Sequence, residues 1–250
     1  MDRPFSPTLL VFTLGAARES ERRSLLPRSL RDVEIGVREG CLEAALAAGR
    51  AGGCRLEVCS PSSIALPADV RHTAQDGSGF GSRLERAMLD AFARGAGPLL
   101  VVGTDVPGLT GQQVSRALAL LADDPDRVVL GPSPDGGFYL LAVRRPIENL
   151  GSATRWCRRD TLRGLLRALR RARRDVLLLE PLADLDCRAD LESWLAARPK
   201  REDRWRLLSR LLRRLLAAFC RPFVAAGPNR LRPALAATIT GRSPPLLPAP

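Results

Sequence analysis

The sequence predicts a layered α/β domain built on a largely parallel sheet. Strand-like and helix-like segments alternate along the chain from about residue 8 to residue 197, which is typical of this fold class. The strand-like segments are short and apolar, as expected for strands that are covered on both faces. With 250 residues, of which 45% are hydrophobic, the chain is long enough to bury the core of one or two domains.

The predicted strands are apolar runs that stop at a turn residue. The run TLLVFTL is followed by Gly15, and the run CRLEVCS is followed by Pro61. The six predicted strands lie at 8–14, 54–60, 98–104, 127–131, 138–143 and 175–180.

The predicted helices have apolar residues near helical spacing and recognisable end signals. Ser82 stands three residues before Glu85, which is a capping-box spacing, and Gly95 closes the same segment. The predicted helices lie at 32–49, 82–94, 110–121, 159–173 and 189–197. We predict a polar, arginine-rich loop from Gly15 to Pro27 and a glycine-rich loop at 76–81.

The pattern changes beyond Arg198, so we place the domain at 1–198. Leucines and aromatic residues recur at helical spacing among arginines over 203–219, which predicts a basic amphipathic helix within 199–222. A proline-rich flexible tail is predicted at 223–250. The helix has three possible roles: it packs on the domain, lies on an anionic membrane as a peripheral contact, or docks on a partner protein.

The charge is uneven along the chain. The formal net charge is +12, and the excess lies beyond residue 150. Such basic character indicates either an anionic partner or simply a solvated, arginine-rich surface. No nucleic-acid partner is expected, because the arginines lack interleaved aromatic residues. The chain shows no apolar run long enough for a transmembrane helix and no signal-peptide pattern, so a cytoplasmic protein is expected. The cysteines and the single histidine lack zinc-ligand spacing.

The first candidate motif is VVGTDVPGL at 101–109. Asp105 stands at the end of a predicted buried strand, where parallel sheets bind their ligands. Its carboxylate can hold a hard divalent cation that bridges diphosphate oxygens. The alternative is that Asp105 only caps a helix or braces a turn.

The second candidate motif is GPSPDGGFY at 131–139. Gly136 and Gly137 allow positive φ and a close approach of the backbone to a ligand. Asp135 can contact a sugar hydroxyl or a metal, and Tyr139 can offer an aromatic face or a hydroxyl. The alternative is an ordinary hairpin turn, since Asp-Gly between two apolar runs is itself a strong turn signal.

The third candidate motif is LDCRADL at 185–191. Asp186 follows a predicted strand, which makes it a candidate ligand. Asp190 lies in the first turn of a predicted helix, where interaction with the helix dipole explains it without any further role.

Together these motifs resemble the DUF2064 proteins. This bacterial group is related to GT-A-type nucleotide-diphosphosugar transferases and to cofactor nucleotidyltransferases. Residues 103–109 match a G-S-D-C-P-G-L signature, and 131–139 match G-P-x-x-D-G-G-Y-Y. Residues 184–191 match D-x-D-T-P-E-D-L loosely, and 79–84 match a G-x-L-G-E-R-M segment with Arg83 retained.

The resemblance implies a Rossmann-like GT-A domain with three α/β/α layers and a divalent cofactor, Mg²⁺ or Mn²⁺. It implies that the catalytic residues are Asp105 and Asp135, and that the metal ligands are Asp105 and Asp186. It further implies nucleotide or phosphate binding by Arg22, Arg23, Arg83, Gly103 and Thr104, and substrate binding by Gly136, Gly137, Tyr139 and Trp156.

Three functions follow as hypotheses. The first is a metal-dependent glycosyltransferase whose partner is a nucleotide-diphosphosugar donor. The second is a nucleotidyltransferase acting on a phosphorylated cofactor precursor. The third is a non-catalytic binding module that works through its basic C-terminal helix.

The stretch 16–27 departs from the family pattern. The family has P-x-P-G-x-x-K-T-R-L-x-P here, a loop expected to hold phosphates, whereas this chain has no Pro-Gly and carries Arg22 in place of the lysine. Glu19 and Glu21 add negative charge to the same stretch. The family's W-S-T becomes Trp156, Cys157 and Arg158. These changes predict shifted binding or weakened activity.

Overall fold

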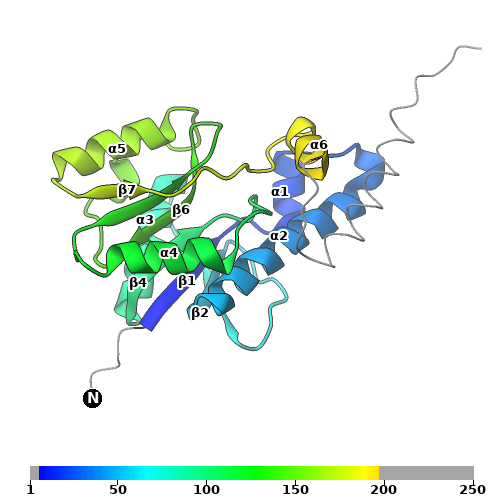
Figure 1. Ribbon diagram of the computed structural model, residues 1–250. Coiled ribbons are helices and arrows are strands. Elements are labelled where there is room, and N and C mark those ends of the chain that lie inside the picture. The colour runs from blue at the N-terminus through cyan, green and yellow to red at the C-terminus, as the bar shows by residue number, and fades with distance from the viewer. Residues whose placement is uncertain (1–5, 197–250) are drawn as a thin grey trace, which may run out of the picture. The chain divides into compact units, whose positions relative to one another are not determined.

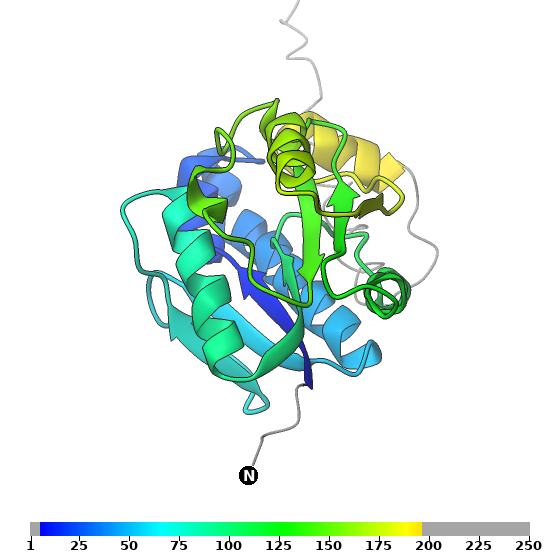
Figure 2. The same ribbon diagram turned by 90° about the vertical axis from the view of Figure 1, so that its left-hand side faces the viewer.

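The computed structural model describes residues 6–196, which form a seven-stranded sheet between two layers of helices (Figures 1 and 2). The strand order is β3-β2-β1-β4-β6-β5-β7, and only β6 runs antiparallel to its neighbours. The strands are β1 (Ser6–Phe12), β2 (Arg55–Ser60), β3 (Val70–Ala74), β4 (Ala96–Val102), β5 (Val128–Pro132), β6 (Phe138–Val143) and β7 (Val176–Leu178). The predicted three-layer, mostly parallel α/β fold is therefore confirmed.

Two hydrophobic clusters fill the spaces between the sheet and the helices. The helices α2 (Arg31–Ala51) and α4 (Gly111–Leu121) cover one face, and α3 (Phe80–Ala93) and α5 (Thr161–Arg171) cover the other. Alternate residues of β1 enter opposite clusters: Leu9 and Val11 face α2 and α4, whereas Leu10 and Phe12 face α3 and α5. A strand covered on both faces must be apolar throughout, which explains the continuous runs in the sequence.

The antiparallel strand β6 follows from a short connection. Residues 133–137 join β5 to β6, and a parallel crossover needs a dozen or more residues. The two strands therefore pair as a hairpin, with Leu130 opposite Leu141. Because β6 is reversed, it begins at the same edge of the sheet at which β1 and β4 end.

The structure corrects the prediction for residues 15–27. Helix α1 (Ala16–Arg22) occupies most of a stretch that the sequence predicts to be a loop. Gly15, with a φ of 88°, turns the chain out of β1, and the Glu19 carboxylate accepts a hydrogen bond of 3.2 Å from the backbone N–H of Leu14. This acidic residue in the first turn suits the positive end of a helix.

Strand β3 is a second difference from the prediction. It pairs with β2 on one side only, and much of its surface is exposed. Its sequence, VRHTA, therefore lacks the apolar run that marks a central strand. The remaining short elements are η1 (Arg28–Leu30), η2 (Leu150–Ser152) and α6 (Arg188–Ala196).

A buried ion pair fixes the connection between α1 and α2. Arg38 and Glu34 are 6% and 1% exposed, and Arg38 Nε lies 3.2 Å from Glu34 Oε1. The same carboxylate accepts hydrogen bonds from the Ser24 hydroxyl at 3.0 Å and the Leu26 backbone N–H at 3.1 Å. The Arg38 guanidinium also donates to the carbonyl of Arg23. The connection that follows Arg22 is thus tied to α2.

The predicted helix at 199–222 and tail at 223–250 lie outside the described residues, so those predictions and the boundary at residue 198 stay predictions. Among residues 6–196, none of the helices combines the length and apolar composition that a membrane span requires.

We expect Arg38→Met to lower the free energy of unfolding by about 3–5 kcal/mol, because it leaves the Glu34 carboxylate buried without its cation. The double variant Glu34→Gln/Arg38→Met should lower the free energy of unfolding clearly less, because no charge of this pair then remains buried. Urea denaturation of both variants measures this difference. A double variant that is as unstable as the single one would contradict it.

Candidate active site

A cavity of about 550 Å³ lies at the edge of the sheet where β1 and β4 end. Phe12 at the end of β1, Val102 at the end of β4 and Phe138 at the start of β6 all line it. This edge is where open parallel α/β sheets bind ligands. The strand order therefore places the cavity where the sequence predicts a site.

Carboxylates from three separate connections meet in this cavity. Asp105 follows β4, Asp135 lies in the β5–β6 hairpin, and Asp184 and Asp186 follow β7. Carboxylate oxygens of Asp135, Asp184 and Asp186 all lie within 4.8 Å of one another. The backbone N–H of Leu185 donates a hydrogen bond of 2.7 Å to the carbonyl of Asp105, which ties the segment after β7 to the end of β4.

Local backbone hydrogen bonds orient these acids. The N–H of Gly137 donates to Asp135 Oδ1 at 2.8 Å, so the hairpin turn holds the carboxylate that it presents. Asp190 Oδ2 accepts from the N–H groups of Asp186 and Cys187 at 3.1 and 2.8 Å. Asp190 therefore shapes the turn that carries Asp184 and Asp186.

Burial and mutual repulsion raise the pKa of two carboxyls. The pKa of Asp105 rises to about 7, mainly because the surrounding protein removes water and then because Asp184 and Asp186 repel its charge. Desolvation and the neighbouring Asp135 and Asp186 raise the pKa of Asp184 to about 6. Both groups hold a proton in the pH range where an ordinary aspartate has lost it.

Arginines also line the cavity. They are Arg22, Arg23, Arg38, Arg158 and Arg159. Arg23 forms an ion pair with Asp186, and this attraction outweighs desolvation and raises the pKa of the guanidinium. Arg38 is held by Glu34. The cavity thus combines an acidic cluster with cationic groups, as a site for a metal and phosphates would require.

An aromatic wall completes the cavity, formed by Phe12, Phe80, Phe138 and Trp156. The ring centroids of Phe12 and Phe80, and those of Phe80 and Trp156, lie 5.4 Å apart, and those of Phe138 and Trp156 lie 6.2 Å apart. Trp156 Nε1 donates to the carbonyl of Gly151 at 2.9 Å, which fixes the indole. Such a wall can stack against a base or against the apolar face of a sugar.

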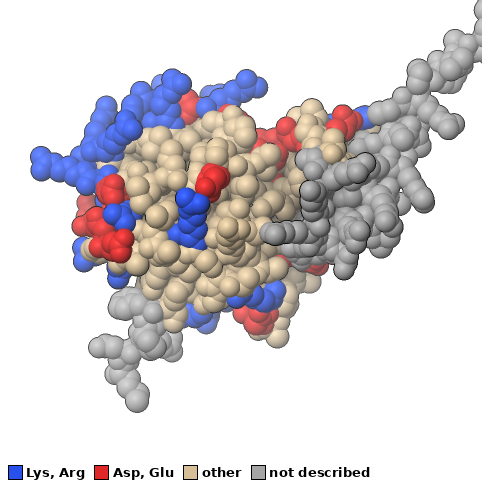
Figure 3. Space-filling view, viewed as in Figure 1, with Lys and Arg blue, Asp and Glu red and all other residues tan. Residues whose placement is uncertain are grey.

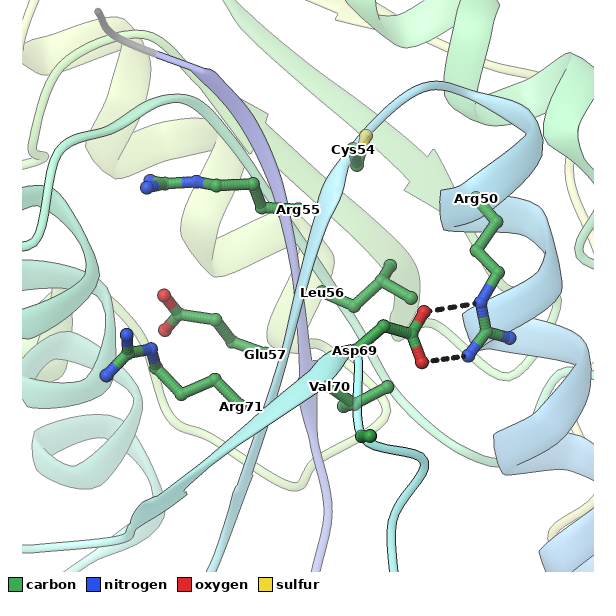
Figure 4. Close-up of a pocket in the computed structure, with 9 residues that line it drawn as sticks. Arg50, Cys54, Arg55, Leu56, Glu57, Asp69, Val70 and Arg71 are labelled. Atoms are coloured by element: carbon green, nitrogen blue, oxygen red, sulfur yellow. Dashed lines mark hydrogen bonds and ion pairs between the residues drawn. The ribbon is translucent and has the colours of Figure 1, made fainter. Parts of the chain in front are cut away.

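A second cavity, of about 530 Å³, lies where β2 and β3 begin (Figure 4). Its charged groups are largely paired, because Arg50 makes two hydrogen bonds of 2.8 and 2.9 Å to Asp69 (Figure 4). Glu57, which is buried, pairs with Arg94 at 2.6 Å. We regard the first cavity as the candidate site, because in the described part of the chain it alone contains a carboxylate cluster of metal-binding size.

Comparison with known families matches residues 37–158 to DUF2064, which is described as an uncharacterized protein conserved in bacteria. The chain carries a DUF2064 region. This confirms the resemblance predicted from the motifs around Asp105 and Asp135, both of which lie within the matched residues. Among curated proteins, none matches the sequence.

A solved structure confirms the fold of this chain. A protein from Desulfovibrio desulfuricans G20, provisionally described as a nucleotide-diphospho-sugar transferase, is 24% identical over 85% of this chain and 96% of that chain, with a TM-score of 0.71. Rv0371c from Mycobacterium tuberculosis H37Rv is more distant: it is 16% identical over 77% of this chain and 98% of that chain, with a TM-score of 0.48. A nucleotidyl transferase from Methanothermobacter thermautotroptrophicus is 17% identical over 76% of this chain and 95% of that chain, with a TM-score of 0.48.

Most of the residues that the DUF2064 resemblance singles out line the cavity. They are Arg22, Arg23, Gly103, Thr104, Asp105, Asp135, Gly137, Tyr139, Trp156 and Asp186. The Thr104 hydroxyl lies 2.9 Å from that of Thr13, which joins the ends of β4 and β1. The structure adds Asp184, which sequence reasoning missed as a ligand. The repetition Asp184-x-Asp186 after a strand is the signal that could have found it.

Three of the residues that the resemblance singles out are placed differently from what their proposed binding roles require. The Tyr139 hydroxyl donates to the carbonyl of Glu180 at 3.1 Å, so the buried side chain offers the cavity a ring and not a free hydroxyl. Arg83 does not line the cavity; it lies in the first turn of α3, where its Nε is buried and has no hydrogen-bond partner among residues 6–196. Gly136 does not line the cavity either.

Gly136 instead packs against the connection before α5. Its φ is 92°, and a Cβ added to it would lie 1.8 Å from the carbonyl oxygen of Arg159. Its own carbonyl accepts a hydrogen bond of 3.0 Å from the N–H of Leu162. The second glycine-rich motif therefore docks the hairpin that presents Asp135 onto α5.

We expect Gly136→Ala to lower the free energy of unfolding by at least about 3 kcal/mol, because it adds a steric clash to a positive φ. Gly53→Ala is the matched control: its φ is 71°, but nothing lies within 4 Å of the added Cβ. The control should cost about 1 kcal/mol. Equal losses in urea denaturation would refute the close packing at Gly136.

We expect the stability of the metal-free protein to fall as the pH rises from about 4 to about 7. Asp105 binds its proton more tightly in the folded chain than at its usual pKa of 3.8, so its contribution is complete at low pH and is lost as the pH passes about 7. The corresponding loss for Asp184 ends near pH 6. Asp105→Asn should therefore flatten the decline between pH 6 and 7, as measured by urea midpoints in a chelating buffer. An unchanged slope would count against the raised pKa of Asp105.

Proposed function

We propose that this protein is a metal-dependent glycosyltransferase that uses a nucleotide-diphosphosugar donor. One observation carries the proposal: acids from three separate connections converge in a single cavity that also holds arginines and an aromatic wall. Each group suits a different part of such a donor. The acids suit a cation, Arg22 suits the diphosphate, and the rings suit the base or the sugar.

The acidic cluster fits a hard divalent cation. Asp135, Asp184 and Asp186 supply only carboxylate oxygens, the donors that Mg²⁺ and Mn²⁺ prefer, and these oxygens are close enough to share one ion. A bound cation would stabilise the negative charge that develops on the departing diphosphate. This set differs from the expected pair of Asp105 and Asp186, because Asp105 is not one of the three clustered acids.

Asp105 then has a positioning role beside the cluster. Its carbonyl accepts the hydrogen bond from Leu185, between the two acids that follow β7. Its side chain, with a pKa of about 7, can donate a hydrogen bond from its protonated form near neutral pH. The hydrogen bond from Leu185 holds the segment of Asp184 and Asp186 in place, and a protonated Asp105 adds no negative charge beside them.

The altered stretch after β1 still supplies cations. Arg22 lines the cavity, and its guanidinium can bind a phosphate through paired hydrogen bonds. Arg23, in contrast, is occupied by Asp186, and Glu19 adds a negative charge to the same wall. These two features support weakened binding of the donor and of the cation compared with an unobstructed site.

We expect the double variant Asp184→Asn/Asp186→Asn to weaken Mn²⁺ binding more than tenfold, and to weaken nucleotide-diphosphosugar binding with it, because two carboxylate ligands are lost. Calorimetry with a panel of common nucleotide sugars measures both affinities. Asp123→Asn is the control, because that side chain is 81% exposed and does not line the cavity.

Two outcomes would contradict the proposal. If the wild-type protein binds none of the nucleotide sugars, the donor assignment fails. If the double variant binds Mn²⁺ as tightly as the control, the cation lies elsewhere. The released product separates the chemistries: a nucleoside diphosphate is expected from sugar transfer, whereas free diphosphate would indicate nucleotidyl transfer.

A further inference from the structure

Within the described part of the chain, three arginines of the cavity lining have no partner for their guanidinium groups. Arg23 and Arg38 are held by Asp186 and Glu34. Within residues 6–196, no hydrogen bond or ion pair reaches the guanidinium groups of Arg22, Arg158 and Arg159. Arg22 lies in the stretch already assigned to donor phosphates. Arg158 and Arg159 come from a different part of the chain, and the donor does not account for them.

The backbone that carries Arg158 and Arg159 is firmly held. The N–H of Arg158 donates to the Thr161 hydroxyl at 3.0 Å, and the N–H of Thr161 donates to the carbonyl of Arg158 at 3.0 Å. Thr161 is only 5% exposed. The side chains of both arginines are exposed, although their backbone is fixed. The fold therefore presents two cationic groups at defined positions beside the cavity.

This connection also adjoins the hairpin that presents Asp135. The carbonyl of Arg159 fills the space next to Gly136, and Leu162 donates to the carbonyl of Gly136. Arg158 and Arg159 thus lie beside the hairpin side of the site, whereas Arg22 belongs to α1. The side of a transferase site that the donor phosphates leave free is available to the acceptor.

The acids of the cavity would repel an anionic acceptor unless cations offset them. A pair of guanidinium groups offers several N–H donors that match the oxygens of a phosphate or a carboxylate. A neutral alcohol would accept weaker hydrogen bonds from these arginines, without the attraction between opposite charges. An acceptor with an anionic group would gain charge-assisted hydrogen bonds from them.

We propose that Arg158 and Arg159 bind a phosphate or carboxylate group of the acceptor, so that the acceptor is an anion. That the bound anion is the acceptor rests on the proposed function, whereas the anion site itself does not. Phosphate and carboxylate share the required chemistry, because each presents negatively charged oxygens to two adjacent guanidinium groups.

The exposed face of α5 supplies a matched control. Arg163 and Arg167 lie on this helix, are exposed and do not line the cavity. Figure 3 shows basic side chains gathered over α5. A substitution of Arg163 and Arg167 removes the same charge from the same region without touching the cavity.

The experiment measures binding of glycerol 3-phosphate, glycerate and glycerol to the full chain by calorimetry in the presence of Mg²⁺. We expect at least one of the two anions to bind and glycerol not to bind. Arg158→Gln/Arg159→Gln should weaken binding of that anion at least about tenfold, because it removes charge-assisted hydrogen bonds. Arg163→Gln/Arg167→Gln should leave it unchanged, and circular dichroism should show both variants folded.

The outcomes are distinct from those of the donor test. The anion site is overturned if neither anion binds more tightly than glycerol, or if the Arg158→Gln/Arg159→Gln variant binds as the wild type does. Equal weakening by the α5 control would also overturn it, because the effect would then be general charge. If nucleotide sugars fail to bind but the anion pattern holds, the transferase proposal fails and the anion site stands. Comparison of glycerol 3-phosphate with glycerate shows whether phosphate or carboxylate is preferred.

Discussion

Four aspartates lie close together at one end of the sheet, and the surrounding structure has to offset their repulsion. It does so in three ways. Backbone N–H groups hold Asp135 and shape the turn around Asp186, Arg23 pairs with one carboxylate, and Asp105 keeps its proton to a higher pH than usual. None of these acids is needed to build the sheet, whose strands are held by two apolar clusters. The stability of the fold therefore tolerates a site that is itself unfavourable.

The fold could be predicted because its strands are buried on both faces. Runs such as that of β1 leave a clear apolar signal, and the turn residues that end them mark the edge where the site lies. The same logic placed Asp105, Asp135 and Asp186 near one another, since each follows a strand or lies in a hairpin at that edge. For Asp135 the hairpin-turn interpretation is correct, and that turn presents the carboxylate to the cavity; its role in binding a ligand stays a proposal.

What could not be predicted depends on packing between distant segments. Helix α1 has a polar sequence with few apolar positions, so it lacks the periodic apolar pattern that predicts a helix. The sequence does not show whether the Tyr139 hydroxyl has a partner, but in the fold it donates a hydrogen bond to a carbonyl. Gly136 looks like a ligand-binding glycine, and only the carbonyl of Arg159 next to it shows that it serves the docking of the hairpin. Such contacts join parts of the chain that local patterns treat as independent.

The ion pair between Arg23 and Asp186 joins the stretch after β1 to the acidic cluster. The Asp186 carboxylate cannot interact equally strongly with this arginine and with a cation at the same time. The two interactions compete, and their competition is reciprocal by thermodynamic linkage. Whatever draws the guanidinium away, such as an arriving phosphate, tightens the hold on the cation, and whatever binds the carboxylate frees the guanidinium. A cation and a phosphate, the ligands proposed for this site, should therefore bind cooperatively, through a single contact between residues 163 positions apart in the chain.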